Sequence, residues 1–208
     1  MYGLTPKEYQ FLKRLNTPNK IQDYLDTLPI NYEKSGETYH SPRFVLQHKK
    51  AHCLEGALLA AVALMIQGHK PLLLDLRTTS RDTDHVVALF KVNGYWGAIS
   101  KTNHAVLRFR DPVYKTLREL VLSYFHEYFL SENGKKTLRE YSAPFNLKTI
   151  GIDWITSDKN LQEIANALDD ARHYPIAPKS ALKLLRNASD IEIRAGKLTE
   201  WSRKDRRT

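Results

Sequence analysis

The sequence predicts an α+β fold in which a central helix packs on an antiparallel sheet, with extra helices around it. Two observations predict this class. The run from Cys53 to Gln67 is apolar on nearly every side, as in helices that are buried on all faces. The segments that follow have the composition of strands, and Asn93-Gly94 is a strong signal for a two-residue hairpin turn. Hairpins mixed with helices favour α+β over a doubly wound parallel sheet.

Two helices are expected before the central one. Thr5 is a suitable cap for the first, which begins at Pro6. The second begins at Pro18, and its apolar residues recur at helical spacing until Pro29 ends it. Residues 31–42 are polar and are expected to form a loop.

Strand patterns follow the central helix, and weaker patterns fill the rest of the chain. The expected strands are residues 71–76, 85–92, 95–99 and 105–109. The next expected elements are a helix over 117–130, a strand over 150–155, and helices over 161–168 and 177–186. We therefore expect a core over residues 1–140 that includes the N-terminal helices. A C-terminal α/β extension over 141–208 packs on this core and ends in a basic mobile tail.

The composition and motifs of the sequence indicate which cellular compartment and which cofactors to expect. With one cysteine the chain cannot form an internal disulfide, which favours a reducing compartment. The N-terminus lacks the apolar core of a signal peptide, and the longest apolar run, Ala57 to Ile66, is too short to span a bilayer. We expect a cytoplasmic protein without membrane association. The sequence has neither a P-loop nor a GxGxxG motif, so no nucleotide or other cofactor is expected.

The formal net charge is +9, because 32 lysines and arginines outnumber 23 acidic residues. A basic balance favours polyanionic partners such as nucleic acid. The excess lies in separate clusters at 49–50, 135–136 and 203–207, so a solvated basic surface is the simpler interpretation.

Cys53 is the first candidate for chemistry. It lies at the predicted start of a helix, where unpaired backbone N–H groups favour an anion. Lys49, Lys50 and a protonated His52 would add positive potential, and each of these effects lowers the pKa of a thiol. The alternative is that this cysteine, beside so many aliphatic residues, is a small buried hydrophobe.

His85 is the second candidate. It opens the strand HVVALFKV, which is apolar on both faces and therefore central. A histidine at this position can reach the helix start that carries Cys53. A cysteine nucleophile needs such a base to hold the thiolate and later to protonate the leaving group. The alternative is a capped surface histidine at the start of a strand.

The runs HCLEGALLAAVALMIQGHKPLLLDL and DHVVALFKVNGYWGAIS resemble the transglutaminase-like superfamily of cysteine enzymes. The resemblance covers residues 17–112. It implies a papain-like core with a nucleophilic cysteine that begins a helix, a histidine that begins a strand, and an aspartate after the next strand. Cys53 matches the nucleophile and His85 the base, and residues 93–96 match the hairpin between the two core strands.

The third residue departs from this pattern, which places a carboxylate at about Ser100. A serine or an asparagine can still accept the His85 N–H and fix its tautomer, but a neutral group stabilises an imidazolium less. Asn103 is similar to the third member of the Cys-His-Asn triad, and Asp111 is an alternative third residue from a nearby loop. Asp84 is not expected to orient His85, because it is adjacent in the chain and adjacent strand residues point to opposite faces.

Two further residues are candidates for oxyanion or substrate binding. Gln47 precedes the cysteine by six residues, which is similar to the interval of the oxyanion-hole glutamine in papain-like enzymes, although a surface glutamine is the simpler interpretation. Trp96 could line a substrate groove or belong to the core. His104, His126 and Glu127 show no paired ligand spacing, so no metal site is expected.

The resemblance and these residues predict a transglutaminase-like cysteine hydrolase or acyltransferase. It would act on a peptide or carboxamide bond of a peptide or protein substrate, through a Cys–His pair with an atypical third residue. The alternative is a catalytically inactive domain of the same fold, whose basic surface binds a polyanion or a protein partner.

Overall fold

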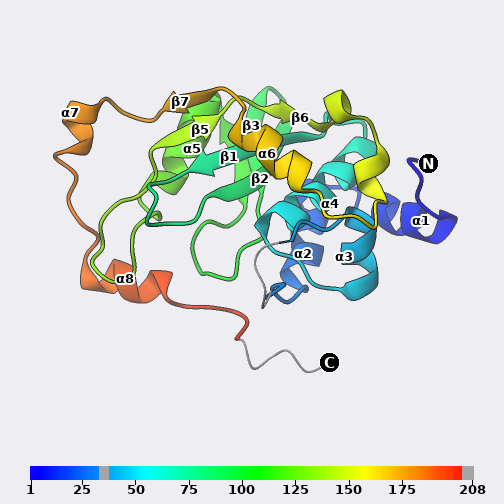
Figure 1. Cartoon of the computed structure of the whole chain (residues 1–208), viewed down its shortest axis with the longest axis horizontal. Helices are drawn as coiled ribbons and strands as arrows, with labels where there is room; N and C mark the ends of the chain where they lie inside the picture. The colour runs from blue at the N-terminus through cyan, green and yellow to red at the C-terminus, as the bar shows by residue number, and fades with distance from the viewer. Residues whose placement is uncertain (33–37, 203–208) are drawn as a thin grey trace.

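The fold is built around one antiparallel sheet, shown in Figure 1 by a computed structural model that describes residues 1–32 and 38–202. In the described part the sheet has seven strands in the order β4-β3-β2-β1-β5-β7, and β6 pairs with β1. The strands are β1 (Leu72–Arg77), β2 (His85–Val92), β3 (Tyr95–Ile99), β4 (Arg110–Tyr114), β5 (Glu140–Ser142), β6 (Phe145–Asn146) and β7 (His173–Pro175). The paired strands run antiparallel, so the fold is α+β, as the sequence predicts.

Proline and hydroxyl residues define the starts of the N-terminal helices. The helices are α1 (Pro6–Arg14), α2 (Pro18–Asp26), α3 (Pro42–His48), α4 (Cys53–Ile66), α5 (Leu117–Phe125), α6 (Gln162–Asp169), α7 (Lys179–Leu182) and α8 (Asp190–Gly196), with 3-10 turns η1 (Leu147–Ile150) and η2 (Asp153–Ile155). The side chains of Thr5, Thr17 and Ser41 each accept a backbone N–H from the first turn of the helix that follows. These caps place α1 and α2 where the sequence predicts them.

The helix α4 is the buried centre of the molecule. Every residue from Leu54 to Met65 is buried. The helices α1, α2 and α3 pack on one side of α4, and β2 packs on the other (Figure 1). This surrounding explains why α4 carries no polar face.

Alternate residues of β2 belong to two separate hydrophobic clusters. Val86, Ala88 and Phe90 pack in the cluster that contains α4. Val87 and Leu89 pack in the cluster that contains the buried side chains of α5. The sheet therefore lies between α4 on one face and α5 on the other, and β2 is apolar on both faces for this reason.

The hairpin between β2 and β3 has the predicted turn. Asn93 and Gly94 have φ angles of 49° and 86°. Two consecutive positive φ values are the requirement of a type I′ turn, which matches the twist of the two strands. This turn fixes the register that pairs Lys91 with Trp96.

Two predicted strands are wrong. The strand that was expected over 105–109 is β4, which begins five residues later at Arg110. Leu107 has a φ angle of 60°, which interrupts an extended backbone. Residues 150–155 form parts of two 3-10 turns and no strand, and Gly151 between the turns has a φ angle of 83°.

Two predicted helices are shorter in the structure, and some expectations lie outside its described part. The helix expected over 117–130 ends at Phe125, and within 177–186 only Lys179–Leu182 is helical. The expected loop ends at Pro42, where α3 begins. Residues 33–37 of that loop and residues 203–208 of the expected mobile tail lie outside the described residues.

The C-terminal part of the chain joins the sheet of the core. The strand β5 spans the expected boundary at residue 140, and it pairs with β1 and with β7. Residues on both sides of the expected boundary therefore belong to one sheet. Within residues 1–32 and 38–202, no helix has the length and apolarity that crossing a membrane requires.

Candidate active site

Cys53 is held at the first residue of α4 by the residues around it. His52 has an extended backbone, and its N–H donates to Oε2 of Glu55 at 2.9 Å. A carboxylate three residues into a helix that accepts this N–H fixes where the helix begins. The thiol therefore lies at a helix N-terminus, where backbone N–H groups favour an anion.

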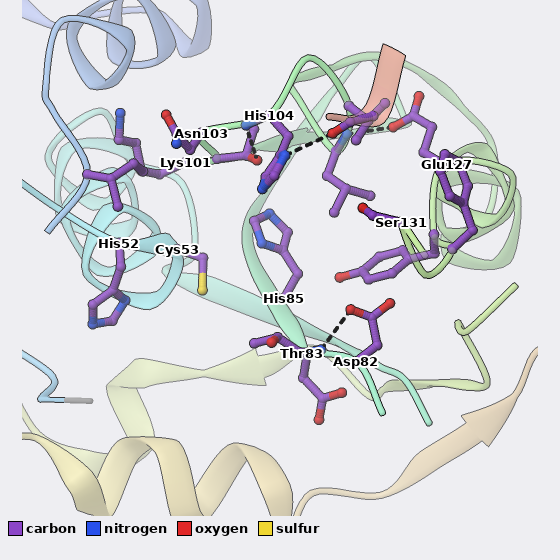
Figure 2. Close-up of a pocket in the computed structure, with 18 of the residues that line it drawn as sticks. His52, Cys53, Asp82, Thr83, His85, Lys101, Asn103, His104, Glu127 and Ser131 are labelled. Atoms are coloured by element: carbon purple, nitrogen blue, oxygen red, sulfur yellow. Dashed lines mark hydrogen bonds between the residues drawn. The ribbon is translucent and has the colours of Figure 1, made fainter. Parts of the chain in front are cut away.

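The side chain of Cys53 lies between two histidines (Figure 2). The side chains of both His52 and His85 act on the thiol and lower its pKa. His85 is the first residue of β2, and only 7% of its surface is exposed. The structure thus brings together the cysteine and the histidine that the sequence singles out.

Ser100 fixes the tautomer of His85. The ring nitrogen Nε2 of His85 lies 2.7 Å from Oγ of Ser100. The hydroxyl hydrogen of Ser100 is donated to the carbonyl oxygen of Leu107, so its oxygen is left to accept. His85 therefore carries a hydrogen on Nε2, and Nδ1 is the ring nitrogen that remains for Cys53.

The surroundings of Cys53 favour a thiolate. Burial raises the pKa of the thiol, but hydrogen bonds from His52 and His85 and the charges of both rings lower it further than burial raises it. The net result is a pKa well below the usual value for cysteine. A low pKa together with an adjacent base is the pattern of an activated nucleophile.

Gln22 of α2 holds the backbone of Ser100. Its Nε2 donates to the carbonyl oxygen of Ser100 at 2.8 Å, and its Oε1 accepts the N–H of Ser100 at 3.0 Å. Gln22 is itself 6% exposed. This clamp fixes the residue that orients His85, and nothing in the local sequence around Gln22 indicates it.

Two cavities meet at the thiol. The larger has a volume of about 390 Å³, and Cys53, His85 and Glu127 are among the residues that line it (Figure 2). The smaller has a volume of about 280 Å³, and Cys53 also lines it. Cys53 therefore borders both cavities.

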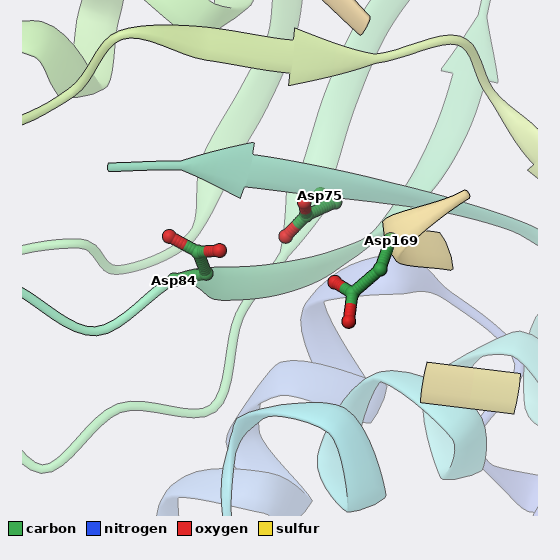
Figure 3. Close-up of side chains that lie close together, drawn as sticks. All are labelled: Asp75, Asp84 and Asp169. Atoms are coloured by element: carbon green, nitrogen blue, oxygen red, sulfur yellow. The ribbon is translucent and has the colours of Figure 1, made fainter. Parts of the chain in front are cut away.

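Three carboxylates gather at the smaller cavity. Asp75, Asp84 and Asp169 each place an oxygen within 4.8 Å of the others (Figure 3). Asp75 pairs with Nε2 of His173 at 3.0 Å, and Asp84 accepts the backbone N–H of Thr78 at 2.7 Å. Burial and the charge of Asp84 raise the pKa of Asp75 to about 6.

Within the described residues, this acidic cluster is the one group of three or more carboxylate, histidine or cysteine side chains whose spacing could hold a metal ion. Carboxylate oxygens are the ligands that hard divalent cations prefer. The sequence did not indicate the cluster, because its members come from β1, the loop before β2 and α6. His104 and Glu127 line the other cavity and are not part of it.

Asn103 lies at the larger cavity but has other partners than the histidine. Its Nδ2 donates to the hydroxyl of Tyr32 at 2.7 Å and to the carbonyl oxygen of Trp201 at 2.8 Å. Its Oδ1 accepts the N–H of Trp201 at 2.7 Å. Asn103 therefore anchors the C-terminal segment, and Ser100 is the residue that contacts His85.

The structure places three other candidates away from the thiol. Gln47 is exposed on α3 and lines neither cavity. Asp111 is exposed on β4 and likewise lines neither cavity. Trp96 lies opposite Lys91, near the hairpin end of β2, while His85 is at the other end. Gln47 and Trp96 are therefore not the oxyanion and substrate contacts that the sequence predicted. Asp111 is likewise not an alternative third residue.

The chain has little similarity to known proteins. No protein family and no curated protein matches the sequence. Among solved structures, the chain is similar to Legionella pneumophila LapG (EGTA-treated), with a TM-score of 0.42 and 11% sequence identity. The similarity covers 72% of this chain and 82% of that chain. A likeness at this level assigns the chain to no family.

Proposed function

We propose that this protein is a transglutaminase-like cysteine hydrolase or acyltransferase with a papain-like core, acting on a peptide or carboxamide bond. One observation carries the proposal. Cys53 begins a buried helix and lines the same cavity as His85, whose Nε2 is held by Ser100 and whose ring lowers the pKa of the thiol. A nucleophile, an adjacent base and a group that orients the base are the three parts that covalent acyl transfer requires.

The chemistry follows from the positions of these groups. The thiolate of Cys53 attacks the carbonyl carbon, a C–S bond forms, and the carbonyl oxygen takes the negative charge. A backbone N–H at the start of α4 would stabilise that oxyanion. His85 then gives the proton on Nδ1 to the leaving amine as the C–N bond breaks, which leaves a thioester on Cys53.

The second half-reaction uses the same histidine as a base. His85 takes a proton from a water or an amine as it attacks the thioester, and the thiolate leaves. Water gives hydrolysis or deamidation, whereas a primary amine gives a new amide bond. The two cavities that meet at Cys53 provide separate space for the acyl group and for the leaving or incoming amine.

Single-turnover acylation tests the proposal. The protein is mixed with p-nitrophenyl acetate, and the acylated residue is located by intact-mass and peptide mass spectrometry. We expect acetylation of Cys53 that is followed by turnover, and no acetylation there in Cys53→Ala. His48→Asn is the matched control, because it removes an exposed histidine of α3 and should leave the rate unchanged.

The same experiment identifies the group that accepts the acyl chain from Cys53. It also distinguishes the enzyme from the alternative, a non-catalytic binding module. Adding a fluorescent primary amine distinguishes transfer from hydrolysis, because transfer yields a fluorescent amide. Absence of acylation at Cys53 would contradict the proposal. It would leave the binding-module alternative, which predicts salt-dependent retention on heparin from the net charge of +9.

A further inference from the structure

His52 is a second histidine beside the thiol, and its Nε2 atom has a hydrogen-bond partner of its own. Its Nε2 lies 2.8 Å from the carbonyl oxygen of Thr38. A carbonyl oxygen only accepts, so Nε2 carries a hydrogen. Nδ1 is therefore the ring nitrogen that remains for the neighbouring Cys53. When Cys53 is a thiolate it can only accept, so a ring that donates to it from Nδ1 and to the Thr38 carbonyl from Nε2 is an imidazolium.

A buried carboxylate lies beside this ring. Glu55 has no exposed surface, and its Oε1 lies 3.7 Å from Nε2 of His52. The carboxylate also accepts the backbone N–H groups of His52 and His40, and the side-chain amide of Asn31. Burial raises the pKa of Glu55, and the charges and N–H groups of the two histidines oppose this. Each of these hydrogen-bond partners is a donor, which fits the ionised, acceptor-only form of the side chain.

The other charged groups around His52 are predominantly acidic. Glu55 and Cys53 face it from α4, and Nε2 of His40, from the segment before α3, lies 4.0 Å from Oε1 of Glu55. The ring of Tyr39 packs edge-on against that of His52. Further titratable groups share the two cavities that His52 lines, and these are Asp75, Asp84, Asp169, Asp82, Glu127, His85, His104, Lys101, Tyr32 and Tyr128. Burial lowers the pKa of His52, but the hydrogen bond and charge of Cys53 and the charge of Glu55 raise it to about 9.

We propose that His52 and Glu55 form a standing ion pair that holds Cys53 as a thiolate, which leaves His85 to carry the protons of the reaction. This inference rests on the proposed role of Cys53 as a nucleophile. In a simple Cys–His pair, one imidazolium must both stabilise the thiolate and protonate the leaving group. Here His52 has both nitrogens engaged and cannot approach a leaving group, so the two tasks fall on different histidines.

The test separates thiolate formation from proton transfer. The ultraviolet absorbance of the thiolate is titrated against pH in the wild-type protein and in His52→Asn, Glu55→Gln, His85→Asn and His48→Asn. We expect His52→Asn to lower the thiolate fraction at acidic pH about tenfold. Glu55→Gln and His85→Asn should each lower the thiolate fraction less than His52→Asn does. The control His48→Asn should leave it unchanged.

Leaving-group dependence gives the second measurement. A p-nitrophenyl ester needs no proton on its leaving group, whereas an amide does. His85→Asn should therefore slow acylation by an amide far more than by the ester, and His52→Asn should slow both to the same extent.

The outcomes distinguish this inference from the proposed function. If His52→Asn keeps the wild-type thiolate titration, the ion pair is not what holds the thiolate and the inference fails, while acylation of Cys53 can still occur. If wild-type Cys53 titrates as an ordinary thiol, the proposed function fails with it. Circular dichroism checks folding, and His52→Asn alone decides the matter if Glu55→Gln does not fold.

Discussion

The Nε2 atom of His85 lies 2.7 Å from Oγ of Ser100, whose hydroxyl donates in turn to the carbonyl oxygen of Leu107. A serine can accept from the first and donate to the second. A carboxylate only accepts, and it would meet the Leu107 carbonyl with like partial charge. A neutral residue at position 100 is therefore matched to its surroundings and still orients the ring of His85.

We predict that Ser100→Ala slows the acylation of Cys53 by an amide substrate by roughly 10–100-fold, because an unpartnered buried N–H on His85 costs about 1–3 kcal/mol. Ser100→Asp should not restore the rate, since it repels the Leu107 carbonyl. Pre-steady-state kinetics measures both. The control is Ser142→Ala, another buried serine, whose Oγ accepts the N–H of Asp75 at 2.9 Å. An equal loss of rate in this control would contradict a specific role for Ser100.

The sequence contains the local parts of this site, but it does not show the contacts that join distant segments. The start of α4 at Cys53 and the turn at Asn93-Gly94 follow from residues next to each other, and both were predicted. The clamp of Gln22 on Ser100 joins residues 78 positions apart. No periodicity or spacing reports such a contact, because it depends on how α2 packs against the end of β3.

The same limit explains two misplaced residues. Asn103 was a candidate partner of His85, but it is bound to Trp201, which is 98 positions away. Leu107 was expected within a strand, but its positive φ turns the chain so that its carbonyl reaches Ser100. Both outcomes depend on tertiary packing that local preference does not determine.

Two buried tyrosines, Tyr124 in α5 and Tyr128 shortly after it, give opposite predictions for the free energy of unfolding. The hydroxyl of Tyr128 has no hydrogen-bond partner among the described residues, whereas that of Tyr124 donates to the carbonyl oxygen of Arg108 at 3.0 Å. Tyr128→Phe should therefore leave the free energy of unfolding unchanged or raise it. Tyr124→Phe should lower it by about 1 kcal/mol, because it removes this hydrogen bond and leaves the carbonyl with only Nη1 of Arg110, at 3.2 Å, as a donor.

Urea unfolding at neutral pH measures both tyrosine variants under identical conditions. A loss of stability in Tyr128→Phe as large as that in Tyr124→Phe would show that the Tyr128 hydroxyl has a partner that stabilises the fold.

Asp75 gives a prediction for pH dependence. Burial and the charge of Asp84 raise its pKa from 3.8 to about 6. A carboxyl whose folded pKa is raised favours the folded state only while it is protonated. This contribution is fully present below the unfolded pKa and is lost as the pH rises through about 6.

Asp75→Asn should therefore be more stable than the wild-type protein at about pH 7, by about 2–3 kcal/mol, and the difference should shrink toward about pH 4. Urea unfolding across this range measures it. Asp169→Asn is the control, because Asp169 belongs to the same cluster but is exposed, and its effect should be small. A stability difference for Asp75→Asn that does not change with pH would contradict the assignment.

The rate at which iodoacetamide labels Cys53 as a function of pH, in the wild-type protein and in His85→Ala, tests the central claim most directly. We predict that wild-type Cys53 is labelled at its full rate well below the ordinary thiol pKa of about 8.5, and that His85→Ala moves the profile to higher pH. A wild-type profile centred near pH 8.5, with no change in His85→Ala, would contradict the claim that these two side chains act as a catalytic pair.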